Sequence, residues 1–337
     1  MQEYRVAIIG FGGIARLHYA AYRALISEGL PIRVVAVCEK NTANIYEEVK
    51  INLGGDHVAL DRSIPVYTDV DTLLAECEFD VADVCLPLFL HKDFIVKLLE
   101  AGKHILCEKP MASDSSQCRE MIDAAERCGK LLMIGQCLRF DPHYRYLKNC
   151  VAEGTFGKLL HLTMERISIY PSWAADFQSS ARTGGCILDT HIHDLDMARY
   201  LLGDPTSVST VRYDRIPHGQ LVNTRLFYDD VTVLIDCAWD DARPEPFRHG
   251  YHAKFENASV VFDGEKTLVY PNTRTPYRAE IADADRIAEE IRAFVNTLSD
   301  GKLQSTENPP ESALMSVKLV ETAIKSAANR GESIRFC

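Results

Sequence analysis

Residues 4–15 read YRVAIIGFGGIA, and this stretch decides the fold of the first half of the chain. The run Arg5–Ile9 is short and apolar, which is typical of a buried strand. The turn that follows fits G-x-G-x-x-G/A, with alanine in the last place. Glycines in such a turn let backbone N–H groups approach a pyrophosphate at the N-terminus of the next helix. The stretch therefore predicts a dinucleotide site, and a purely structural glycine turn is the alternative. The candidate cofactor-binding residues of this site are Gly10, Phe11, Gly12, Gly13 and Ile14.

Further short apolar runs follow within the first 135 residues, and the segments between them carry apolar residues at helical spacing. Strands that are apolar throughout and separated by helices indicate βαβ units with both faces of the sheet covered. We therefore expect an α/β fold whose N-terminal domain is a doubly wound parallel Rossmann sheet. Its later strands are expected at Ile32–Cys38, Val81–Leu86, His104–Cys107 and Leu131–Ile134.

Glu39 follows the second expected strand. In dinucleotide-binding folds an acid at this place hydrogen-bonds the hydroxyls of the adenosine ribose, and its charge repels a 2′-phosphate. Glu39 therefore favours NAD as the cofactor. Lys40 beside it keeps NADP possible, and a solvated glutamate at a strand end is the alternative.

The pattern changes after about residue 140. A helix is expected near 142–153, a strand near 159–166, a helix that includes 195–202, and alternating extended segments around Val231–Trp239. Two helices near 285–298 and 311–329 close the chain. We predict a dinucleotide-binding domain over 1–135 and a substrate-binding and oligomerisation α+β domain over 136–337. The second domain is expected to hold a large open, mostly antiparallel sheet, and the closing helices are able to pack back on the first domain.

Composition narrows the possible partners. The net charge is −11, and Lys and Arg do not cluster, which argues against nucleic acid and anionic membrane surfaces. The 11 cysteines are scattered without a CxxC pair, as in proteins of a reducing compartment. No apolar run is long enough to span a membrane, and the first strand leaves no room for a signal peptide. A cytoplasmic protein is expected.

Residues 188–196 read LDTHIHDLD, a dense group of titratable side chains. If residues 189–202 are helical, Asp189 and His193 share one face at i, i+4. His191 is then either a pocket-lining or a structural residue, and Asp194 and Asp196 are expected to be helix-start charges, with Arg199 as a partner. A metal-dependent hydrolase using His191 and His193 is a rival, but the sequence nominates no further ligands for it.

Residues 102–110 read GKHILCEKP and place Lys109 at the carboxyl edge of the parallel sheet, where such sheets bind ligands. Together with GFGGIA, LPLFLH at 86–91, GQCLRFDP at 135–142 and GGCILDTHIHDLDMARYLLG at 184–203, this motif makes the chain resemble the Gfo/Idh/MocA oxidoreductases, the family of glucose–fructose oxidoreductase and inositol dehydrogenase. The chain departs from the usual family pattern at Thr183, Cys137, His191 and Ile287.

The resemblance implies an NAD(P)-dependent oxidoreductase acting on a secondary alcohol of a sugar, cyclitol or related polyol. It implies Lys109, Asp189 and His193 as the catalytic set, and a homo-oligomer, dimer or tetramer, formed through the open sheet. Its motifs add Leu86, Pro87, His91, Glu108 and Lys109 to the cofactor-binding candidates.

The chemistry suits these residue types. The pKa of histidine lies near physiological pH, so His193 is suited to accept the hydroxyl proton as the hydride leaves for the nicotinamide. Lys109 is suited to stabilise alkoxide character on the same oxygen. Candidates to line a sugar pocket, with plain packing as the alternative, are Arg139, Arg166, Trp173 and His191.

Two rivals keep the fold. The first is a redox-neutral enzyme that cleaves glycosides or exchanges hydride between sugars through a transient keto intermediate. The second is a non-catalytic dinucleotide sensor, which normally lacks the lysine or the histidine. Both Lys109 and His193 are present here.

Overall fold

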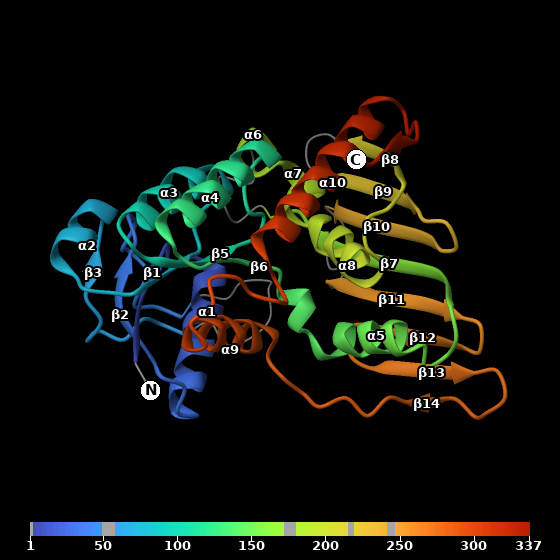
Figure 1. Ribbon diagram of the computed structural model, residues 1–337, viewed down its shortest axis with the longest axis horizontal. Helices are drawn as coiled ribbons and strands as arrows, with labels where there is room; N and C mark the ends of the chain where they lie inside the picture. The colour runs from blue at the N-terminus through green and yellow to red at the C-terminus, as the bar shows by residue number, and fades with distance from the viewer. Residues whose placement is uncertain (1–2, 49–57, 172–179, 215–218, 241–246) are drawn as a thin grey trace. The chain divides into compact units, whose positions relative to one another are not determined.

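The computed structural model describes residues 3–48, 58–171, 180–214, 219–240 and 247–337 (Figure 1). The chain divides into two compact units, Met1–Phe140 with Ala284–Leu314, and Asp141–Asp283 with Met315–Cys337. This division differs from the expected boundary after residue 135. The first unit takes up a late segment because α9 (Arg286–Ser299) carries an apolar face that belongs to the first core.

The first unit holds a parallel sheet of six strands in the order β3-β2-β1-β4-β5-β6 among the described residues. This order, in which the strand sequence reverses beside β1, is that of a Rossmann sheet and places the ligand edge at the carboxyl ends of the strands. The four later strands of the sequence prediction are present, and the two-residue β3 was not foreseen. The bounds are β1 Tyr4–Ile9, β2 Ile32–Cys38, β3 Val66–Tyr67, β4 Val81–Val84, β5 His104–Glu108 and β6 Leu132–Gly135.

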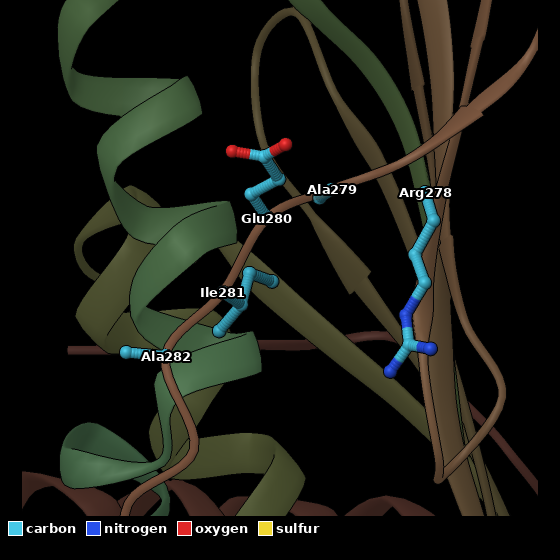
Figure 2. A pocket seen from close by; sticks show the side chains of 5 residues that line it. All are labelled: Arg278, Ala279, Glu280, Ile281 and Ala282. Carbon is cyan, nitrogen blue, oxygen red and sulfur yellow. The ribbon is translucent and has the colours of Figure 1, made fainter.

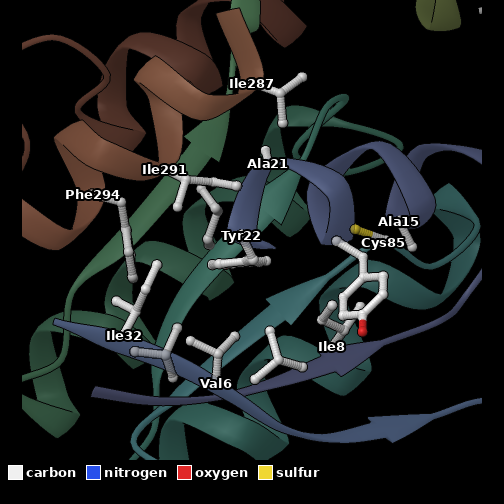
Figure 3. Packing of buried hydrophobic residues seen from close by; sticks show 14 of the residues in the cluster. Val6, Ile8, Ala15, Ala21, Tyr22, Ile32, Cys85, Ile287, Ile291 and Phe294 are labelled. Atoms are coloured by element: carbon white, nitrogen blue, oxygen red, sulfur yellow. The ribbon is translucent and has the colours of Figure 1, made fainter. Parts of the chain in front are cut away.

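Helices cover both faces of this sheet (Figure 1). The helices α3 and α4 pack on each other, whereas α1 packs against α9. Figure 3 shows Ile287, Ile291 and Phe294 of α9 directed toward Ala21 and Tyr22 of α1 in one apolar cluster. The helices are α1 Gly13–Ser27, α2 Val70–Glu76, α3 His91–Glu100 and α4 Ser115–Cys128, with short 3-10 turns η1 Leu88–Leu90 and η2 Cys137–Phe140.

Aspartate caps fix where several helices begin. Asp69, Asp114 and Asp285 each accept a backbone N–H of the first turn of α2, α4 and α9. In the second unit Asp141 caps α5 (Pro142–Glu153), whose first residue is a proline that needs no N–H partner. The caps satisfy donors that would otherwise lack partners.

The second unit holds a mixed sheet of nine strands in the described residues, in the order β14-β13-β12-β11-β7-β10-β9-β8-β15. Its described pairings are antiparallel except that of β7 with β10. The bounds are β7 Leu159–Ile169, β8 Ser207–Asp214, β9 Gln220–Phe227, β10 Thr232–Asp240, β11 Arg248–Phe255, β12 Ala258–Phe262, β13 Thr267–Pro271, β14 Tyr277–Arg278 and β15 Ile334–Arg335.

One face of the second sheet carries helices and the other is open in the described part of the chain (Figure 1). Strand residues alternate accordingly, so that Leu162 and Met164 are buried while Thr163 between them is partly exposed. The other helices of this unit are α6 Ser180–Thr183, α7 Gly185–Asp189, α8 Ile192–Leu202 and α10 Pro310–Ala328. Among the described residues no helix combines the length and apolarity needed to cross a membrane.

Candidate active site

The glycine turn follows β1 at the carboxyl edge of the parallel sheet. Gly10 has φ +88°, and a Cβ there would lie 2.8 Å from the carbonyl oxygen of Cys85, so only glycine fits without a shift. Gly12 is the exposed N-cap of α1 and supplies no side-chain cap, and the first turn contains no acidic residue. The open N–H groups and the positive end of α1 fit the pyrophosphate of a dinucleotide.

Glu39 closes this turn from the neighbouring strand. Its Oε2 accepts the backbone N–H of Phe11 at 2.7 Å, and its Oε1 accepts the N–H of Asn41 at 2.7 Å. The carboxylate therefore lies beside the glycine turn, where an adenosine ribose would reach it.

His91 holds together the two loops beyond β4 and β5. Its side chain is 1% exposed, with Nε2 2.8 Å from the carbonyl oxygen of Leu86 and Nδ1 2.9 Å from that of Pro110. Burial lowers the pKa of His91, so the neutral imidazole is favoured. The ring of His91, a predicted cofactor contact, bonds backbone on both sides and so positions the loop that carries Leu86 and Pro87.

Lys109 follows β5, and its peptide bond with Pro110 is cis. Its backbone N–H donates to Glu108 Oε2 at 3.1 Å, and Glu108 Oε1 lies 3.0 Å from His18 Nε2. The other nitrogen of His18 lies 2.9 Å from Asp83. Burial opposes the charged form of His18, but the Asp83 carboxylate helps raise its pKa well above the ordinary value. The buried ionic network of Asp83, His18 and Glu108 thus holds the backbone at Lys109 in place.

In the second unit the LDTHIHDLD stretch is not one helix, which corrects the sequence prediction. The helix α7 ends at Asp189, and α8 begins at Ile192. The backbone N–H groups of Thr190 and His191 both bond the carbonyl of Cys186, and His193 N–H bonds that of Thr190, so the helical ladder is interrupted between the two segments. Asp189 and His193, both half-buried, therefore sit on two short helices in place of one continuous helical face.

His191 is completely buried, and its Nε2 lies 2.8 Å from Thr224 Oγ1. Burial, followed by the positive charge of Arg166, lowers the pKa of His191 to about 3. A buried, neutral imidazole bonded to Thr224 fits the structural alternative for His191. In the described part of the chain, the His/Cys/Asp/Glu groups compact enough to hold a metal are His18 with Asp83 and Cys85, and His18 with Glu108 and Glu290, so neither includes His191 or His193.

The two aspartates that follow His193 are buried. Asp194 lies in the first turn of α8, as expected for a helix-start charge, but it is completely buried and accepts from Arg166 Nε at 2.8 Å. Asp196 is 1% exposed and accepts from Ser316 at 2.6 Å, while Arg199 pairs with Asp204 at 2.7 Å. Both aspartates lie on the face of α8 that packs inward.

The suggested sugar contacts are placed as follows. Arg166 is 4% exposed and is engaged by Asp194 and by the Tyr144 hydroxyl, so it faces the interior of its unit. Arg139 is 2% exposed and donates to the carbonyl of Glu307 and to Ser312 at 2.7 Å each. These contacts fit the packing alternative for both arginines. Trp173 lies outside the described residues.

A hollow of about 580 Å³ lies along residues 278–282, just after β14 (Figure 2). Its walls are consecutive residues of one segment, and none of the predicted site residues lines it. We therefore do not assign it to the reaction.

Family models match the two parts of the chain in order. Residues 4–136 match a model described as an oxidoreductase family with an NAD-binding Rossmann fold, and residues 144–265 match the GFO/IDH/MocA C-terminal domain. The chain belongs to the Gfo/Idh/MocA oxidoreductase family. Its dinucleotide is therefore NAD, and the glycine turn and Glu39 are the groups that fit it.

Other members of the Gfo/Idh/MocA family align over much or all of the chain. Inositol 2-dehydrogenase of Rhizobium meliloti is 27% identical over 97% of each chain, and D-glucoside 3-dehydrogenase of Escherichia coli is 31% identical over 63% of this chain and 58% of its own. The solved structure of a levoglucosan dehydrogenase with NADH and L-sorbose superposes with a TM-score of 0.82, at 19% identity over the whole of both chains.

Three buried polar residues of this Gfo/Idh/MocA protein escaped the sequence prediction. His18 and Glu290 occupy positions in the buried stripes of α1 and α9, where an apolar residue is expected, and that mismatch was a usable signal. Gln136 is 2% exposed, and its Nε2 has no hydrogen-bond partner in the described part of the chain. It follows β6 at the ligand edge of the sheet.

Proposed function

We propose that this protein is a dehydrogenase that uses NAD to oxidise a secondary hydroxyl of a cyclitol, a sugar or a related polyol. The observation that carries the proposal is the alignment of both domains, end to end, with an inositol 2-dehydrogenase. The position of Lys109 at the carboxyl edge of the parallel sheet supports it, because ligands of such sheets bind there.

NAD, when bound, supplies the hydride acceptor at its nicotinamide ring. In the proposed reaction His193 accepts the hydroxyl proton, and Lys109 donates a hydrogen bond to the same oxygen as negative charge develops on it. Asp189 orients the imidazole or holds a neighbouring hydroxyl. Lys109 belongs to the first unit, and Asp189 and His193 belong to the second.

A substrate screen tests the function directly. Cyclitols, aldoses, amino sugars and glycosides are each incubated with NAD or NADP, and the absorbance of reduced cofactor is followed together with product analysis. The expected result is a keto product formed in equal amount to NADH. A product formed without net NADH would support the redox-neutral reaction, and NAD binding without any turnover would support the sensor.

We further propose that the protein is a cytoplasmic homo-oligomer whose interface is the open face of the second sheet. Large apolar or aromatic side chains are exposed along its strands, as expected for a surface that a second copy covers. The described cysteines form no disulfide, which supports a reducing compartment. The exposed sheet residues are Leu160, Val211, Tyr213, Tyr270 and Tyr277.

A further inference from the structure

Glu290 is a buried acid for which the proposed reaction has no use. It lies on α9, its side chain is completely buried, and neither carboxyl oxygen has a hydrogen-bond partner in the described residues. Burying an ionised carboxylate without partners is strongly unfavourable, so this position needs a physical explanation.

The groups that face Glu290 belong to the ionic network of Asp83, His18 and Glu108 that holds the backbone at Lys109. One oxygen each of Glu290 and Glu108 and one nitrogen of His18 all lie within 4.8 Å of one another. A Cβ on Gly135 would lie 3.2 Å from Oε1 of both Glu108 and Glu290, so the two carboxyl groups converge over the bare Cα of that glycine. Glu290 is therefore directed at Glu108.

Charge balance decides the state of Glu290. The imidazolium of His18 lies between the carboxylates of Asp83 and Glu108. The two negative charges of these carboxylates already outnumber its single positive charge. Arg286, one turn earlier on α9, is a further cation that acts on Glu290. Burial, followed by the charge of Glu108, raises the pKa of Glu290 well above its ordinary value. A third carboxylate in this space is disfavoured, and a neutral acid is a hydrogen-bond donor.

We propose that Glu290 is a positioning residue that, as a neutral carboxylic acid, donates an O–H hydrogen bond to the Glu108 carboxylate and thereby fixes the Lys109 turn. Glu108 accepts the backbone N–H of Lys109 through Oε2 and faces His18 through Oε1. The donated bond holds this carboxylate in the orientation that both contacts need. The inference rests on the proposed function insofar as Lys109 acts on substrate.

Two substitutions of Glu290 test whether it acts as a hydrogen-bond donor, as an anion or as a metal ligand. Glu290→Gln keeps the shape and an N–H donor toward Glu108, so kcat should stay within about threefold of the parent and the pH profile should keep its form. Glu290→Leu removes the donor, so kcat should fall about tenfold to a hundredfold while the Kd for NAD stays within about threefold. Glu289→Gln is the matched control, because the neighbouring glutamate is half-exposed and pairs with Arg292.

An infrared difference spectrum reports protonation without reference to activity. The parent should show the C=O stretch of a buried carboxylic acid at neutral pH, and Glu290→Gln should lack it while Glu289→Gln retains it. This comparison also decides the matter if Glu290→Leu does not fold.

Three results would overturn the inference. The first is a parent spectrum without the acid band, which means that Glu290 is ionised. The second is Glu290→Leu with parental kcat. The third is Glu290→Gln as impaired as Glu290→Leu, with stoichiometric metal found in the purified parent by elemental analysis. If the parent oxidises no polyol, the proposed function fails, yet the infrared band still reports the state of Glu290.

Discussion

The carboxylate of Glu39 accepts the backbone N–H of Phe11 at 2.7 Å, which joins the end of β2 to the glycine turn after β1. This bond places a negative charge beside the expected position of the adenosine ribose. Replacing Glu39 with Ala should weaken NAD binding by about tenfold and NADP binding much less, because the lost carboxylate favours the 2′-hydroxyl and repels a 2′-phosphate. Isothermal titration with both cofactors measures the ratio. Lys40→Ala is the control and should leave NAD binding unchanged. An unaltered NAD/NADP ratio in Glu39→Ala would show that the ribose is held elsewhere.

Lys109→Ala and His193→Ala should each lower kcat by about a hundredfold or more, because each removes a group proposed to handle the reacting hydroxyl. NAD binding should stay within a few fold in both variants. Steady-state kinetics on the substrate found in the screen, together with NAD titration, make the measurement. Lys97→Ala and His252→Ala, at exposed positions, are the controls. Retained turnover in either variant would contradict the role proposed for that residue.

His191 should make the fold sensitive to acid. Its folded pKa of about 3 lies below the ordinary value of 6.5, so the unfolded chain takes up a proton that the folded chain refuses. The contribution that neutral His191 makes to the free energy of unfolding is fully present above about pH 6.5. It is lost as the pH falls toward the folded pKa. Between about pH 7.5 and pH 5 the parent should lose about 2 kcal/mol more free energy of unfolding than His191→Gln. Urea unfolding at the two pH values measures this difference, and equal losses would mean that His191 is protonated in the fold.

The buried pair of Arg166 and Asp194 predicts an asymmetric mutational pattern. Burial raises the pKa of Asp194 and Arg166 opposes this, so removing the arginine leaves an uncompensated buried acid. Arg166→Met should lower the free energy of unfolding by about 3 kcal/mol, and the double variant Arg166→Met, Asp194→Leu should recover most of the loss. Denaturant unfolding checks both. Parental stability of Arg166→Met, with a higher KM for substrate, would instead restore the sugar-contact role.

The open sheet should control assembly. Tyr213→Glu, on β8, and Tyr270→Glu, on β13, place a charge on strands near the two edges of the exposed face. Each should lower the molar mass measured by light scattering toward that of one chain, because a buried unpaired charge opposes association. Tyr46→Glu, an exposed tyrosine of the first unit, is the control. An unchanged mass in both sheet variants would place the interface elsewhere.

The Rossmann half of the fold was predictable because its signals are local. A strand, a glycine turn and a helix follow one another within residues 4–27, and each later strand is a separate apolar run. The two-residue β3 has no such run. The bounds of α5 also agree with the prediction, since Asp141, Pro142 and Gly154 mark its two ends.

The errors concern contacts between distant residues. A helical spacing of Asp189 and His193 is visible in the sequence, but the interruption after Asp189 depends on how α7 and α8 pack on the sheet. The ion pair of Asp194 was not predicted because nothing local reveals Arg166, which lies 28 residues earlier on β7. Glu290 meets Glu108 only because α9 returns to the first unit. The chemistry of the residue types could therefore be predicted from the sequence, whereas their hydrogen-bond and ionic partners could be identified only from the fold.

The late return of Ala284–Leu314 to the first unit also bears on protein synthesis. The apolar face of α9 completes the core around α1. A nascent chain that has left the ribosome only as far as residue 283 therefore carries the six parallel strands but lacks α9, so the apolar surface that α9 covers is still exposed. The strands β7–β14 lie in one uninterrupted segment and emerge before α9. Domains of growing chains usually complete in N-to-C order, but translation here finishes the NAD-binding unit only after most of the unit that follows it.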